Sequence, residues 1–304
     1  MPTDKFLTAN GLKLHLRDWG GGHRDGGHLD GDRHLIVLVH GLASNAKIWD
    51  WVAPLVAAES YRVVALDQRS HGLSQPPADI GGEDGGGGFG FESVCADLRG
   101  VIAGLNFEKP VIVGHSWGAS VALEYAARYP EAISGAVLVD GGFLTLGKRM
   151  TWPEAEERLA PPRLAGTPLP QFRERVKAFS GDRYSEGLYD IIMGNFEVLP
   201  DDTIRPHLAF ENHMRIVRAL WEQDAEQLYP RVHCPALFLP CIPPEPHDEM
   251  AASFMHFKYE GAALAERLLP SVRIEWLADS IHDVPLQRPE VVARKIVEFA
   301  RSLG

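Results

Sequence analysis

The feature that most constrains the fold is a short strand that meets a helix at a serine between two glycines, in VIVGHSWGAS at residues 111–120. The run 111–113 has the β-branched composition of a buried strand, and residues 119–128 favour helix. An abrupt turn from strand to helix needs Gly114 and Gly118, which have no Cβ to collide with either element. The turn pushes the side chain of Ser116 clear of the sheet edge. The pattern therefore favours Ser116 as a nucleophile over an ordinary turn serine.

Strands and helices alternate along most of the chain. A hairpin that turns at Asn10-Gly11 comes first. The strands predicted after it are 35–40, 61–67, 111–113, 136–140, 236–240 and 273–278, and the clearest helices are 48–59, 91–105 and 289–302. Such alternation predicts an α/β fold with a mostly parallel sheet that helices cover on both faces.

Two stretches interrupt this alternation. The glycine-rich run at 81–90 lacks the ending of a phosphate-binding loop and is interpreted as a flexible surface loop. Residues from about Phe143 to Ala225 form helical, aromatic-bearing segments without a clear strand. They predict a helical lid over 143–225, between a first core part at 1–142 and a second at 226–304.

Charge and cysteine content narrow the class of protein. A net charge of −11 argues against nucleic acid or an anionic membrane as the main partner. No apolar run approaches membrane-spanning length, and the first residues lack the apolar core of a signal peptide. Three cysteines are too few for a disulfide framework. We expect a cytoplasmic protein, monomer or homodimer, whose partner is a small-molecule substrate.

No cofactor is expected from the sequence. The nearest approach to a metal motif is the set His233, Cys234, Cys241 and His247, and its spacing fits no standard zinc site. We therefore expect no metal.

A serine nucleophile needs a base and an oxyanion site. Among 13 histidines, His282 follows the last predicted strand and precedes the terminal helix, at the sheet edge where active sites of parallel sheets collect. His40 also ends a strand, but the turn His40-Gly41-Leu42 suits a backbone donor. The N–H groups of Leu42 and Trp117 are the predicted oxyanion hole.

These motifs resemble the α/β-hydrolase superfamily. HGLASNAKIWD (40–50) is similar to its oxyanion stretch, DQRSHGLS (67–74) to its Asp-x-Arg-Gly-His-Gly-x-Ser turn, GHSWG to its nucleophile elbow and IHDVPLQRP (281–289) to its histidine loop. The match covers roughly 34–140 and 232–304. The resemblance implies an eight-stranded, mostly parallel sheet with a helical lid after the sixth strand. It also implies that Asp67, Arg69 and His71 shape a turn rather than do chemistry.

The acid of a triad is where the sequence departs from the family pattern. The family usually places it after the strand assigned to 236–240, but that loop reads PCIPPEPHDEM, with Glu245 as a candidate. Haloalkane dehalogenases and certain lactonases carry the acid one strand earlier, at a position that corresponds to Asp140. We prefer Asp140, since Gly141 and Gly142 let the chain leave the sheet tightly, and keep Glu245 as the alternative acid.

The predicted function is a serine hydrolase that cleaves a carboxylic ester or lactone of a small to medium, partly apolar substrate through an acyl-enzyme. Serine at position 116 disfavours haloalkane and epoxide opening, which use an aspartate nucleophile. C–C bond hydrolysis, amide cleavage and perhydrolysis use nearly the same residues and stay open. A ligand-binding receptor with this fold is the alternative from another class.

Overall fold

The computed structural model describes the chain outside residues 21–34, 79–87 and 245–248. The strands are β1 (Thr3–Ala9), β2 (Leu12–Asp18), β3 (Leu35–Val39), β4 (Arg62–Leu66), β5 (Val111–His115), β6 (Gly135–Val139), β7 (Thr167–Pro168), β8 (Phe196–Val198), β9 (Thr203–Pro206), β10 (Ala236–Leu239) and β11 (Val272–Ile274). The α-helices are α1 (Ala53–Ala57), α2 (Phe91–Gly104), α3 (Trp117–Arg128), α4 (Trp152–Leu159), α5 (Leu169–Ser180), α6 (Glu186–Met193), α7 (Phe210–Glu222), α8 (Ala225–Leu228), α9 (Glu249–Leu268), α10 (Val284–Gln287) and α11 (Pro289–Arg301).

Eight strands form the central sheet, in the order β1-β2-β4-β3-β5-β6-β10-β11. β2 pairs antiparallel with β1 and β4, and the pairs from β4 to β11 are parallel. The predicted mostly parallel eight-stranded sheet is therefore confirmed. β5 lies between β3 and β6, so the residues that follow these three strands meet at one edge.

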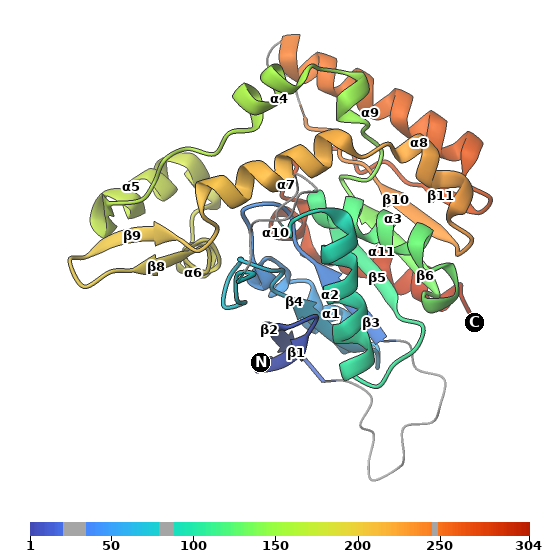
Figure 1. Ribbon diagram of the computed structural model, residues 1–304, viewed down its shortest axis with the longest axis horizontal. Coiled ribbons are helices and arrows are strands. Elements are labelled where there is room, and N and C mark those ends of the chain that lie inside the picture. The colour runs from blue at the N-terminus through green and yellow to red at the C-terminus, as the bar shows by residue number, and fades with distance from the viewer. Residues whose placement is uncertain (21–34, 79–87, 245–248) are drawn as a thin grey trace.

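Alternate residues of each parallel strand enter different cores. Ile36 and Leu38 of β3 belong to the core that α1 and α11 cover, whereas Val37 and Val39 belong to the core under α2 and α3. Because both faces are covered, β3, β5 and β6 are buried along their whole length. Figure 1 shows the helices on the two sides of the sheet.

Two predicted elements are shorter than expected. The helix predicted at 48–59 is divided into a 3₁₀ turn at Ala46–Trp49 and the short α1. Pro54, in the first turn of α1, has no N–H to donate to the preceding turn, so the two segments do not join into one helix. The strand predicted at 273–278 is the edge strand β11, which pairs through Ile274 and adds one isolated bridge at Leu277.

The chain between β6 and β10 forms an insertion that extends away from the sheet (Figure 1). It contains α4 to α8, as the helical composition predicts, and also a three-stranded sheet of β7, β9 and β8. These strands have two to four residues, so they are too short for a period-two pattern to reveal them. The prediction that this segment contains no strand was wrong. That the insertion acts as a lid stays a prediction.

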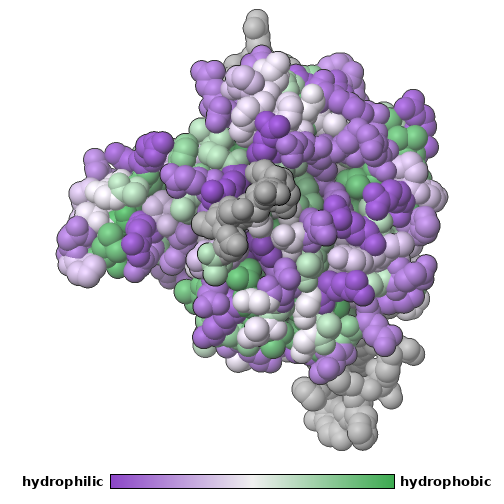
Figure 2. Space-filling model, in the orientation of Figure 1, coloured by the Kyte–Doolittle hydropathy of each residue, from purple (hydrophilic) through white to green (hydrophobic). Residues whose placement is uncertain are grey.

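The surface gives no sign of a membrane span in the part of the chain that is described, because no helix there is long and apolar enough. Hydrophobic residues on the face in Figure 2 lie in small groups among hydrophilic ones. The predicted surface loop at 81–90 falls largely outside the described residues.

Candidate active site

Ser116 occupies a strained turn between β5 and α3. Its backbone angles are φ 55° and ψ −119°, a conformation that non-glycine residues rarely adopt. A Cβ on Gly114 would lie 2.0 Å from the carbonyl oxygen of Gly118, and one on Gly118 would lie 2.3 Å from that of Val39. Both glycines are thus required for the close approach of α3 to β5 and β3, as the sequence predicts.

Asp140 and His282 meet Ser116 at this edge of the sheet. The Oγ of Ser116 lies 2.9 Å from Nε2 of His282, and Nδ1 of His282 lies 2.7 Å from Oδ2 of Asp140. A carboxylate only accepts, so Nδ1–H donates to Asp140 and leaves Nε2 free to accept the hydroxyl proton. Asp140 directly follows β6, whose neighbour in the sheet is β5. The structure therefore brings the three predicted residues together.

The electrostatics of this trio favour a charged pair. Burial raises the pKa of Asp140, but the hydrogen bond and charge of His282 and the Lys258 ammonium outweigh burial and hold it below its ordinary value. Burial lowers the pKa of His282, and Asp140 more than offsets this, so the net shift is upward. The His282 side chain is 52% exposed, so solvent reaches the imidazole.

The predicted oxyanion donors lie beside Ser116. A Cβ on Gly41, the neighbour of Leu42, would lie 3.1 Å from Cβ of Ser116, and Trp117 begins α3. Neither the Leu42 nor the Trp117 N–H has an acceptor among the residues that the structure describes. Two unpaired backbone donors near a nucleophile are what an oxyanion site requires.

Buried side chains hold the loop that carries Leu42. Nδ1 of His40 lies 2.7 Å from the Gly41 carbonyl, and its Nε2 accepts from the N–H of Gln68 at 3.1 Å. The side-chain amide of Gln68 donates to the His40 carbonyl at 2.8 Å. The loop is thereby fixed to the turn after β4.

That turn has the structural role which the resemblance implies. The Asp67 carboxylate accepts from the N–H groups of Ala46 and Leu73, at 2.6 and 3.0 Å. Nε and Nη2 of Arg69 each lie 2.6 Å from an oxygen of Asp97, and both side chains are buried. These contacts link distant segments and involve none of Ser116, His282 and Asp140.

Sequence reasoning missed two residues around the trio. Lys258 of α9 donates to Oδ1 of Asp140 at 2.7 Å, and His115 lies with Nε2 2.8 Å from the backbone carbonyl of His282. His115 could have been noticed, since it precedes Ser116 in the turn. Lys258 carries no such signal, because it lies within a long helix and no spacing relates it to Asp140.

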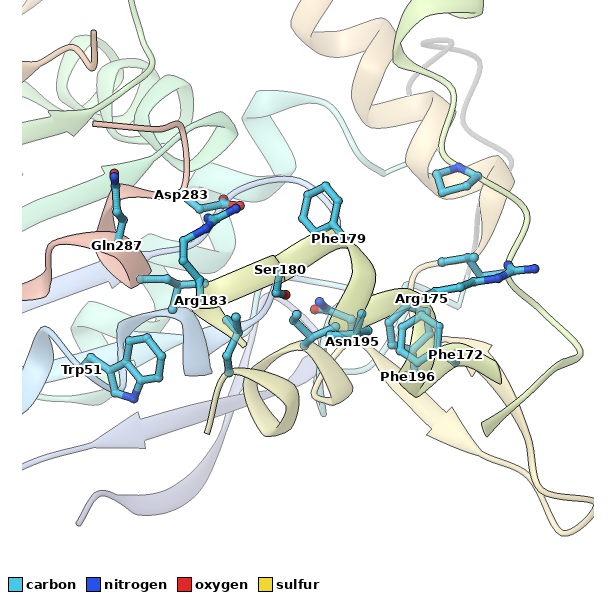
Figure 3. Close-up of a pocket in the computed structure, with 16 residues that line it drawn as sticks. Trp51, Phe172, Arg175, Phe179, Ser180, Arg183, Asn195, Phe196, Asp283 and Gln287 are labelled. Atoms are coloured by element: carbon cyan, nitrogen blue, oxygen red, sulfur yellow. The ribbon is translucent and has the colours of Figure 1, made fainter. Parts of the chain in front are cut away.

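Two hollows flank the site, each with a volume of about 600 Å³. The first lies between the insertion and the core and reaches Asp283, the residue after His282. Figure 3 shows Trp51 and Gln287 on one side of it and Phe172 and Phe196 on the other. The second reaches Ala43, the residue after Leu42. Both linings are mainly apolar, as expected of sites for small organic ligands.

The structure does not place the remaining candidate residues in this site. Glu245, the alternative acid, and His247 lie outside the described residues. Cys234 and Cys241 are buried free thiols. In the described parts of the chain, no three histidine, cysteine, aspartate or glutamate side chains form a group that could bind a metal.

Comparisons with known proteins agree with the observed architecture. A family model described as alpha/beta hydrolase fold matches residues 34–178. AB hydrolase superfamily protein YfhM of Bacillus subtilis is 32% identical over 137 residues, which are 45% of this chain and 42% of that protein. Epoxide hydrolase 1 of Caenorhabditis elegans is 32% identical over 129 residues, 42% of this chain and 28% of that protein. The match thus spans less than half the length of these relatives.

Solved structures match over nearly the whole chain. E-2-(acetamidomethylene)succinate hydrolase superimposes with a TM-score of 0.71 at 19% identity and covers 98% of this chain and 99% of that one. The enol-lactonase from Burkholderia xenovorans LB400 superimposes with a TM-score of 0.67 at 18% identity and covers 97% and 99%. At such identities the likeness shows a shared fold.

Proposed function

The chain belongs to the α/β-hydrolase superfamily, and on that premise we propose that it is a serine hydrolase acting on a carboxylic ester or a lactone. The observation that carries the proposal is the continuous relay from Ser116 Oγ to His282 Nε2, at 2.9 Å, and from His282 Nδ1 to Asp140 Oδ2, at 2.7 Å. This order of nucleophile, base and acid activates an alcohol that is otherwise a poor nucleophile at neutral pH.

The relay supports the following mechanism. His282 accepts the Ser116 proton as Oγ bonds to the ester carbonyl carbon, and the oxyanion that forms accepts from the N–H groups of Leu42 and Trp117. The C–O bond then breaks, and His282 returns its proton to the leaving alkoxide. Water, deprotonated by His282, adds to the acyl-enzyme and forms a second tetrahedral intermediate. When its bond to Ser116 Oγ breaks, His282 returns the proton to Oγ, and the carboxylic acid is released.

Serine at position 116 separates this chain from aspartate-nucleophile chemistry. Epoxide hydrolases occur among the relatives, but a mechanism that opens the epoxide with a carboxylate has no counterpart in a hydroxyl held against His282. The exposure of His282 also supports entry of water for deacylation. We therefore favour acyl transfer over epoxide opening.

The two hollows support a substrate with two arms. One begins beside His282, the other beside Leu42, so a carbonyl on Ser116 would extend substituents toward both. The apolar lining favours small to medium hydrocarbon or aromatic groups.

The first test is covalent labelling of Ser116 by a fluorophosphonate, mapped by peptide mass spectrometry. We expect single, stoichiometric labelling in the wild type and none in Ser116→Ala. His282→Ala should lower the labelling rate by roughly 10³-fold or more. Ser120→Ala, one turn along α3, is the matched control and should label normally.

Substrate class is then resolved with panels of aryl esters, alkyl esters and lactones, alongside amides and C–C bond substrates. Asp140→Asn should reduce turnover by roughly 10⁴-fold. A folded wild type that is not labelled contradicts the proposal and favours the receptor alternative.

A further inference from the structure

The Asp140 carboxylate has a second partner set that ordinary triad chemistry does not use. While Oδ2 faces His282, Oδ1 accepts from Nζ of Lys258 at 2.7 Å and from the N–H of Cys241 at 2.8 Å. The Asp140 side chain is 1% exposed. The carboxylate therefore lies between an imidazole and an ammonium, both within hydrogen-bonding distance.

Lys258 is an unusual residue for this place. Its side chain is 5% exposed, and Nζ also donates to the carbonyl of Cys241 at 3.0 Å and lies 5.4 Å from the centre of the Phe254 ring. Lysine is rarely buried this far unless it is paired. Its stem crosses from α9 to the end of β6, so the pair joins a distant helix to the reacting edge.

The N–H of Cys241 already satisfies Oδ1 as a hydrogen-bond donor. What Lys258 adds is a positive charge, which the neighbouring Asp283, His115 and Cys241 do not supply. Asp283 lies beside His282 on the same loop, and burial lowers the pKa of His115, from β5, to about 4, so His115 is neutral at pH 7. The Cys241 thiol, from the end of β10, is also neutral because burial raises its pKa. Among the residues that the structure describes, Lys258 is thus the lysine or arginine in contact with Asp140.

We propose that Lys258 is a positioning residue of this site: its buried ammonium fixes the Asp140 carboxylate and moderates the negative charge that Asp140 presents to His282. Without the ammonium, the carboxylate would stabilise the protonated imidazole more strongly, and His282 would stay protonated up to a higher pH. A protonated His282 cannot accept from Ser116. Lys258 therefore widens the pH range over which the base is available.

The positive charge of Lys258 determines the direction in which the pKa of His282 changes in Lys258→Met. Removing a cation near His282 raises the pKa of its imidazole, and the acid limb of the reaction moves to higher pH. A unit charge roughly 6 Å away, in surroundings of effective dielectric 20 to 80, shifts a pKa by about 0.5 to 2 units. We expect a shift of that size in Lys258→Met.

The inference rests on the proposed function only for its catalytic consequence, so the primary test measures His282 directly. The imidazole of His282 is titrated by ¹⁵N–¹H NMR in the wild type and in Lys258→Met, with His282→Ala used for assignment. We expect a higher pKa in Lys258→Met and a value close to wild type in Lys258→Arg, which keeps the charge. Lys148→Met, which removes an exposed ammonium 3.1 Å from Asp224, is the matched control and should cause no shift.

The same variants are labelled with the fluorophosphonate across pH. The labelling rate of Lys258→Met should fall at a higher pH than that of the wild type, by the shift that NMR reports. A lysine with only a structural role would lower the rate at every pH and leave the midpoint unchanged, which overturns the inference. A wild type that is never labelled overturns the proposed function instead, and the NMR titration still decides the role of Lys258.

Lys258→Met leaves a buried carboxylate without its cation and risks unfolding. In that case Asp140→Asn is compared with the double variant Asp140→Asn/Lys258→Met, in which both charges are absent. The pKa of His282 should be higher in the double variant, since only the single variant keeps the ammonium. Equal values in the two variants contradict the inference.

Discussion

We predict that the free energy of unfolding decreases in mild acid because of two buried histidines, His71 and His115. Burial and the charge of His40 lower the pKa of His71 to about 3, and burial and the charge of His282 lower that of His115 to about 4. One nitrogen of each faces a carbonyl, that of Arg69 at 2.9 Å and that of His282 at 2.8 Å. The other nitrogen of each has no partner among the described residues. Protonation would therefore create a buried, unpaired donor.

The difference in proton binding between the unfolded and folded states determines how the free energy of unfolding changes with pH. Because the unfolded histidines titrate near pH 6.5, the unfolded state binds more protons than the folded state between pH 6.5 and the folded values. The free energy of unfolding must then fall as the pH falls through this range. From pH 7.5 to 5, each histidine accounts for a loss of about 2 kcal/mol and the two together for about 4 kcal/mol. His282, whose folded pKa is raised, contributes in the opposite direction.

The assay compares variants, so that His282 and other groups cancel. Urea unfolding followed by tryptophan fluorescence is measured at pH 7.5, 6 and 5 in the wild type, in His71→Asn and in His115→Gln. Asparagine places an amide N–H near Nδ1, and glutamine places one near Nε2, so each keeps the hydrogen bond to the carbonyl. Both variants should be less stable at pH 7.5 but should lose about 2 kcal/mol less on acidification.

His256→Gln, in which the replaced side chain is 67% exposed, should keep the wild-type pH dependence. A loss between pH 7.5 and 5 that is identical in wild type, His71→Asn and His115→Gln would refute the reasoning. It would show that neither histidine stays neutral in the folded state because of burial.

Two further substitutions test the frame of the site. Gly118→Ala puts a methyl group 2.3 Å from the Val39 carbonyl oxygen, so it should destabilise the protein by about 1–3 kcal/mol and slow labelling of Ser116; an unchanged melting temperature would contradict this. Arg69→Met leaves the Asp97 carboxylate buried without its cation and should cost about 3–5 kcal/mol in urea unfolding. Arg69→Met combined with Asp97→Asn should restore part of that loss, and an additive double variant would show that the pair is not coupled.

The elements nearest the reaction were the most predictable from sequence. Ser116, Asp140 and His282 each follow a strand or edge segment, and parallel strands deliver such residues to one edge. The preference for Asp140 agrees with its contact to His282, since β6 is the neighbour of β5. Gly114 and Gly118 indicate the close packing of α3 against β5 and β3, because a residue with a Cβ does not fit there.

The parts that sequence did not predict depend on packing between distant segments. Lys258 reaches Asp140 only because of the way α9 lies against the sheet, and a helical period does not specify which lysine is buried. The strands β7, β8 and β9 are stabilised by pairing with one another and have too few residues for an alternating pattern.

The partition between the two hollows comes from the insertion alone. Pro162, Leu164, Asn195 and Phe196 line both hollows, and all four belong to the insertion. Asn195 is tied to the core, since its Oδ1 accepts from Asn45 at 2.7 Å. Substitutions at Pro162, Leu164 and Phe196 can therefore change the shape of both hollows at once, while Asn195 keeps the insertion attached to the core.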